Sequence, residues 1–87
     1  MPPAERMTER EIIERGEQAR AVLDGPLFTE VIAKHRQELL EMIAASKPDE
    51  REVRENCYFQ IQSLAGLRNE LRRIQTRGDK KRDKVTN

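Results

Sequence analysis

Residues 49–78 read DEREVRENCYFQIQSLAGLRNELRRIQTRG, and apolar side chains recur along them at three- and four-residue steps. This spacing predicts one long amphipathic helix over about residues 49–77. Acidic residues occupy its first turns and basic residues its last turns, which suits the direction of the helix dipole. Gly78 is the predicted end, because glycine is common just past the end of a helix. The apolar face carries Val53, Cys57, Ile61, Leu64, Leu67, Leu71 and Ile74.

Two shorter helices are predicted before it, over residues 8–24 and 26–45. The first begins at Thr8, which stands three residues before Glu11 in the pattern of a capping box. Between the two helices lies Asp24-Gly25-Pro26. Here glycine permits a left-handed helix end, and proline cannot continue the helical hydrogen bonds.

The break at residues 46–49 is short, so the second and third helices are expected to form an antiparallel αα-hairpin. Their predicted lengths are roughly 30 Å and roughly 42 Å, which leaves about 12 Å of the longer helix uncovered. Either the first helix or another subunit then covers that end. The predicted fold class is therefore all-α, a short N-terminal helix plus a long hairpin, completed by self-association or partner packing. Residues 1–7 are expected to be flexible and residues 79–87 to form a frayed, basic polar tail.

Composition limits the kind of protein this is. The chain has 87 residues, enough for a single domain at most. Cys57 is the only cysteine, so no disulfide within the chain can stabilise the fold. The N-terminus is polar and charged, unlike a signal peptide, and no apolar run approaches the roughly 20 residues that span a bilayer. We therefore expect a soluble, intracellular protein that does not enter a membrane.

The chemistry of enzymes is missing from the sequence. Cys57 and His35 lie in different predicted helices, too few ligands for a structural zinc site. Cys57 is expected to pack in the core, and His35 to be a packed histidine on the inner face of the second helix that is hydrogen-bonded or edges the core. There is no glycine-rich phosphate loop and no G-x-S-x-G nucleophile motif. We expect no catalytic residue, no metal, no cofactor and no small-molecule substrate.

Charge is distributed unevenly along the chain. Residues 1–67 carry 9 basic and 13 acidic side chains, whereas residues 68–87 carry 8 basic and 3 acidic ones. A basic end of this kind can contact nucleic-acid phosphates, although it can equally complement the helix dipole and remain solvated. No aromatic residue is present there to stack on bases. The candidate nucleic-acid-binding residues are Arg68, Arg72, Arg73, Arg77, Lys80, Lys81, Arg82 and Lys84.

The long helix also offers a surface for a protein partner. Tyr58 and Phe59 lie off its apolar face on opposite flanks, so one hairpin partner cannot cover both. The alternative is that both rings lie along the aliphatic stems of neighbouring Arg and Lys side chains. The candidate partner-binding residues are Tyr58, Phe59, Ile61, Leu64, Leu67, Leu71 and Ile74.

The order of motifs resembles a group of small, uncharacterised helical proteins of tailed bacteriophages and prophages. The resemblance covers about residues 12–78 and lies mainly in the long helix. It departs from the group in having no tryptophan in the second helix and Glu70 where histidine is common. The positions that carry it are Arg15, Gly16, Ala19, Leu27, Phe28, Asp49, Arg54, Glu55, Tyr58, Ile61, Leu64, Leu67, Arg68, Leu71 and Gly78.

This resemblance implies a phage setting, either in the virion or in the cytoplasm of the infected host. The leading hypothesis is a non-enzymatic virion or assembly accessory protein that docks through its long helix on a larger head or tail component, or on itself. A DNA-associated packaging or regulatory factor that uses the basic segment is an alternative. A third hypothesis is a small inhibitor of a host protein.

Overall fold

A computed structural model describes residues 7–86, with side chains described up to residue 84. It contains three helices in the described range, α1 (Glu9–Asp24), α2 (Pro26–Ala45) and α3 (Arg51–Thr86). The predicted all-α class is confirmed, and α2 has the predicted bounds, whereas α1 begins one residue later than predicted, at Glu9, with Thr8 as its N-cap. Residues 1–6 of the expected flexible N-terminus and the last residue of the expected tail lie outside the described part.

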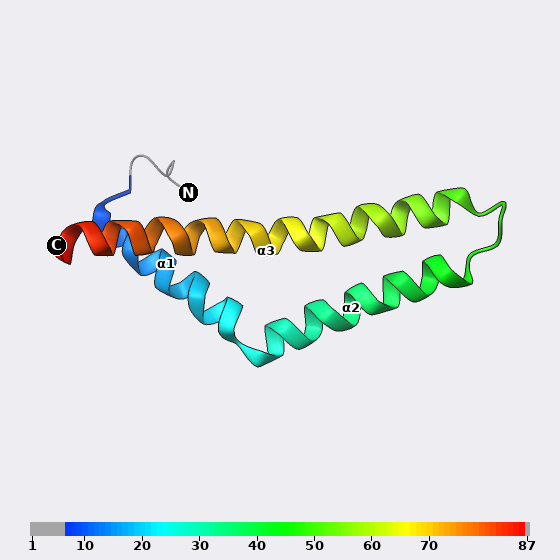
Figure 1. The fold of residues 1–87 in the computed structure, drawn as a ribbon, viewed down its shortest axis with the longest axis horizontal. Helices are drawn as coiled ribbons and strands as arrows, with labels where there is room; N and C mark the ends of the chain where they lie inside the picture. The colour runs from blue at the N-terminus through cyan, green and yellow to red at the C-terminus, as the bar shows by residue number, and fades with distance from the viewer. Residues whose placement is uncertain (1–6, 87) are drawn as a thin grey trace.

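The helices are arranged as a long, thin triangle (Figure 1). α3 forms one side, and α1 and α2 meet at an elbow and cover it from its two ends. The 16 residues of α1 and 20 of α2 together equal the 36 of α3, about 54 Å of helix on each side. The end of α3 that extends beyond α2 is therefore covered by α1. Of the two predicted alternatives, the first helix or another subunit, the structure shows the first helix in this place.

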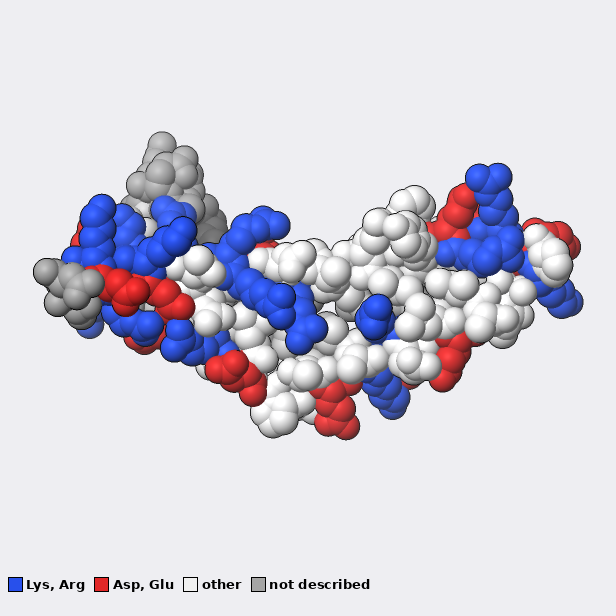
Figure 2. Space-filling model, in the orientation of Figure 1, with Lys and Arg blue, Asp and Glu red and all other residues white. Residues whose placement is uncertain are grey.

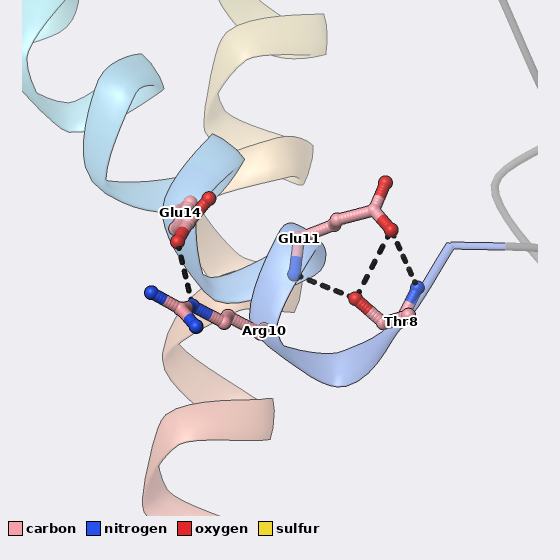
Figure 3. Close-up of polar contacts among 4 residues, drawn as sticks. All are labelled: Thr8, Arg10, Glu11 and Glu14. Carbon is pink, nitrogen blue, oxygen red and sulfur yellow. Dashed lines mark hydrogen bonds and ion pairs between the residues drawn. The ribbon is translucent and has the colours of Figure 1, made fainter.

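The N-terminus of α1 is capped by its own side chains (Figure 3). The backbone N–H of Glu11 donates to Thr8 Oγ1 at 3.1 Å, and the backbone N–H of Thr8 donates to Glu11 Oε1 at 3.5 Å. This is the predicted capping box, which satisfies two backbone donors that the helix leaves free. Arg10 and Glu14 add an exposed ion pair one turn further on.

The prediction that a left-handed glycine ends α1 at the elbow with α2 is wrong. Gly25 has φ −68° and ψ 124°, an extended conformation open to any residue. Pro26 explains this, because proline excludes the helical conformation from the residue before it. Gly25 is nevertheless close-packed, since a Cβ there would lie 3.2 Å from the carbonyl oxygens of both Ala21 and Val22.

Arg54 ties the α2–α3 loop to the start of α3. Its guanidinium donates to the carbonyl oxygens of Lys47 at 2.7 Å and Pro48 at 3.1 Å, and to Ser46 Oγ at 3.1 Å. Ser46 Oγ in turn donates to the carbonyl oxygen of Ile43 at the end of α2. One side chain therefore fixes the turn of the hairpin.

The backbones of α1 and α3 approach each other closely at Gly16 and Gly78. A Cβ built on either glycine would lie 2.8 Å from the Cα of the other, closer than real atoms approach. The prediction that Gly78 ends the third helix is wrong, because α3 continues to Thr86. Gly78 is buried in the crossing and has no positive φ, so tertiary packing overrides the local signal for a helix end.

An ion-pair cluster adjoins this crossing. Arg20 of α1 places Nη2 at 2.8 and 2.9 Å from the two carboxylate oxygens of Asp79, and Arg82 donates to Asp79 Oδ1 at 2.9 Å. These side chains are only partly exposed, which makes the pairing stronger than on an open surface. Residues expected to fray therefore belong to the folded domain.

The core is thin, as expected for a small helical chain. Its buried apolar residues within the described range are Ile12, Ala19, Leu39 and Cys57. The expectation that Cys57 packs inside is confirmed, with 2% of the residue exposed. The prediction that His35 is packed on the inner face of α2 is wrong. His35 lies on the surface with its side chain 48% exposed and Nδ1 3.9 Å from Glu38, because α2 turns the opposite edge of its apolar face toward α3.

Candidate functional site

The first half of α3 contains an uncharged segment that is exposed on its outer side. Residues 56–67 contain no charged side chain, although more than a third of the whole chain is charged. Figure 2 shows this division on one face of the molecule, where basic side chains gather toward both ends and most of the surface between them is uncharged. An uncharged surface of this kind on a highly charged protein is typical of a contact site.

Four residues of this segment form what we call the outer stripe, Phe59, Gln62, Ser63 and Gly66. They follow the i, i+3, i+4, i+7 spacing of one helix face, and that face is opposite the buried Cys57. All four are exposed. The outer stripe therefore faces away from both α1 and α2.

The polar groups of the outer stripe are satisfied within α3. Ser63 Oγ donates to the carbonyl oxygen of Phe59 at 3.0 Å, and Gln62 Nε2 donates to the hydroxyl of Tyr58 at 3.1 Å. The Tyr58 and Phe59 rings stand beside each other, with centroids 6.3 Å apart and planes tilted by 53°. Because these groups need fewer bonds to water, the surface is easier to desolvate than its composition suggests.

Gly66 faces open space in the part of the chain that the structure describes. A Cβ added there would meet no atom within 4 Å. Glycine in the middle of a helix costs about 0.5–1 kcal/mol relative to alanine, and no contact in the described chain offsets this. At Gly16 and Gly78 the same residue type permits two helix backbones to touch. Gly66 offers the same close approach to a helix from outside. The sequence analysis missed it, although a glycine inside a helical pattern was the available signal.

The predicted partner-binding residues divide into two groups. Tyr58, Phe59 and Leu67 are exposed, at 55%, 60% and 50%. Ile61 and Leu64 are half-buried opposite Ile32 of α2. The remaining pair, Leu71 and Ile74, are half-buried against α1. Within one chain, therefore, only the first group is available for a partner.

The predicted nucleic-acid-binding residues lie on a helix rather than on a frayed tail. Arg72, Arg73, Arg77 and Lys80 line one exposed surface near the C-terminal end of α3. Some of the positive charge is already paired, because Arg73 contacts Glu70 at 2.6 Å and Arg82 contacts Asp79. Arg68 lies apart from this surface, in a groove against α2.

The described residues offer neither a cluster of metal ligands nor a membrane-spanning helix. Residues 7–86 contain no group of three or more His, Cys, Asp or Glu side chains placed to hold a metal ion. None of the helices in this range combines the length and apolar character needed to cross a membrane. Comparison with protein-family models, with curated proteins and with solved structures found no match to this chain.

Proposed function

We propose that the chain is a non-enzymatic accessory protein that docks through the outer stripe of α3 on a helix of a larger protein. The observation that carries the proposal is Gly66, an exposed glycine at the C-terminal end of the uncharged outer stripe. Phe59 lies two turns away on the same face and supplies an aromatic anchor that is 60% exposed. A glycine for close approach beside an aromatic anchor suits the packing of a partner helix.

The setting of the proposal comes from the sequence resemblance to small proteins of tailed phages. In that setting the larger protein is a head or tail component, and the chain is a virion or assembly part. Docking requires only that the outer stripe be desolvated, so α1 and α2 keep their own contacts with α3. We therefore expect the chain to fold before it docks.

Quantitative mass spectrometry of gradient-purified particles tests the setting. The particles come from the cells that encode the chain, and the chain is measured against the major capsid protein. We expect a fixed ratio that matches a head or tail symmetry. Absence from the particles would refute a role in the virion.

A matched pair of substitutions tests the docking surface. Phe59→Gln removes the anchor of the outer stripe, whereas Leu27→Gln removes an apolar side chain that is 70% exposed on α2. Both positions are exposed, so both variants should keep the helical circular dichroism of the parent. We expect Phe59→Gln to be lost from particles and Leu27→Gln to be retained. Equal retention of the two variants would contradict docking through the outer stripe.

The exposed surface lined by Arg72, Arg73, Arg77 and Lys80 favours a second candidate, a DNA-associated factor. Truncation is a poor test, because it would also remove Gly78 and Asp79 from the α1–α3 contact. Lys80→Gln with Lys84→Gln is better, since both side chains are exposed. The pair should lower the salt dependence of duplex DNA binding, with a change of about 2 in the log–log slope. If the parent chain shows no salt-dependent binding in fluorescence anisotropy, this candidate is wrong.

A further inference from the structure

A groove runs between α2 and α3 on one flank of the hairpin. Its volume is about 390 Å³, within the usual range for ligand sites. Its apolar lining comes from Ile32 of α2 and from Ile61 and Leu64 of α3. Three arginines, Arg36, Arg68 and Arg72, line the same groove together with Gln62, Ala65 and Asn69.

The three arginines of the groove have no carboxylate to pair with. No Asp or Glu is among the lining residues, and within the described chain none of the three makes an ion pair or hydrogen bond. Several arginines outside the groove are paired, as Arg20 is with Asp79 and Arg51 is with Glu55. Three arginines thus line a groove to which the described part of the protein supplies no carboxylate.

Their spacing allows them to act on one ligand. Arg68 and Arg72 are four residues apart, so they are neighbours about one turn apart along α3. Arg36 approaches from α2 on the other side of the groove. Like charges held this close repel one another, and an anion bound between them would remove that repulsion. Guanidinium groups bind carboxylates and phosphates through paired hydrogen bonds, which favours a planar acidic group.

The apolar lining narrows the chemistry of that ligand. We propose that the groove binds a protein segment in which carboxylates flank an aliphatic side chain. The aliphatic group would lie on Ile32, Ile61 and Leu64 while the carboxylates meet the arginines. No aromatic residue lines the groove to stack on a base, which argues against a single-stranded nucleic acid. The inference goes beyond the proposed function, since the groove shares only Gln62 with the outer stripe.

A labelled amphipathic peptide of Leu and Glu tests this inference by fluorescence anisotropy. Arg36→Gln, Arg68→Gln and Arg72→Gln are combined in one groove variant, and glutamine forms helices nearly as well as arginine. The control variant combines Arg10→Gln, Lys34→Gln and Arg51→Gln, which removes the same charge from exposed positions outside the groove. We expect each groove substitution alone to weaken binding about tenfold, as expected for loss of one charge-assisted hydrogen bond. The control variant should bind as the parent does.

An NMR measurement at the groove and a competition experiment with an oligonucleotide complete the test of the inference. The peptide should shift the side-chain amide resonances of Asn69 in the NMR spectrum of the full chain, and a peptide with Gln in place of Glu should not. Absence of binding, or equal losses in the groove and control variants, would overturn the inference. It would also be overturned if a single-stranded oligonucleotide displaced the peptide and bound more tightly, because the groove would then be a phosphate site. Phe59→Gln should leave peptide binding unchanged, so failure here is separate from failure of the proposed docking on the outer stripe.

Discussion

The same substitution at two glycines of α3 should change stability in opposite directions. Gly66→Ala adds a methyl group to open space, whereas Gly78→Ala adds one against the backbone of α1. At Gly78 the new Cβ would lie 2.8 Å from Gly16 Cα and 3.0 Å from the carbonyl oxygen of Ile12. Neither atom can rotate away as a side chain can, so α1 and α3 must move apart.

The magnitudes follow from two competing terms. Alanine is favoured over glycine inside a helix by about 0.5–1 kcal/mol, and Gly66→Ala should stabilise the fold by that amount. Gly78→Ala gains the same helix preference but overpacks the crossing, which costs about 1–3 kcal/mol. Because all the contacts are with backbone, we expect the upper part of that range and a net loss of about 2 kcal/mol.

Thermal unfolding followed by circular dichroism measures both variants against the parent. For a domain of this size about 1 kcal/mol corresponds to 4–8 °C in Tm. We expect Gly66→Ala to unfold about 4 °C higher and Gly78→Ala roughly 10 °C lower. Equal protein concentrations are needed, because any self-association would raise Tm by mass action. A Gly78→Ala protein as stable as the parent would refute the close crossing of α1 and α3.

Two further predictions concern polar contacts of the fold. Arg54→Leu should destabilise the hairpin by about 1–3 kcal/mol in urea unfolding, because the loop carbonyls lose a charged donor, whereas Arg51→Gln, in an exposed ion pair, should change it by under about 0.5 kcal/mol. If the two variants unfold at the same urea concentration, Arg54 does not hold the loop. Asp79→Asn should lower the free energy of unfolding by about 1 kcal/mol. Arg20 loses its carboxylate partner across the α1–α3 contact, while the volume of the side chain at position 79 is kept. Raising the salt concentration should reduce the difference in the free energy of unfolding between Asp79→Asn and the parent. A difference in stability that does not change with salt would count against an electrostatic cause.

The parts of the fold that could be predicted depend on residues close together in the sequence. The start of α1 follows from Thr8 and Glu11, which cap the same turn. The end of α1 and start of α2 follow from Pro26, which acts on its immediate neighbours. The spacing of apolar residues identified α3 and the face that carries Cys57. Each of these signals acts within about one helical turn, so it can be read without knowing how the helices pack.

The parts that could not be predicted join distant residues. Gly78 signals a helix end by itself and becomes a helix interior only because Gly16 lies against it. The outward position of His35, and the position of Arg36 at the groove with α3, follow from the rotation of α2 about its own axis. That rotation depends on how the side chains of α2 fit those of α3. The spacing of apolar residues identifies the apolar face of α2, but it does not determine which edge of that face lies against α3.

The sequence by itself therefore determined the three helices, their order and the short hairpin turn, because local hydrogen bonding and apolar spacing act within single helices. It also located the apolar face of the long helix and the basic excess after residue 67. Only the tertiary structure decided how far α3 extends. It also decided which glycines lie in the contact between α1 and α3, which glycine is exposed, and which arginines line the groove between α2 and α3. These properties depend on which faces of the helices meet, and that is settled by packing between residues far apart in the chain.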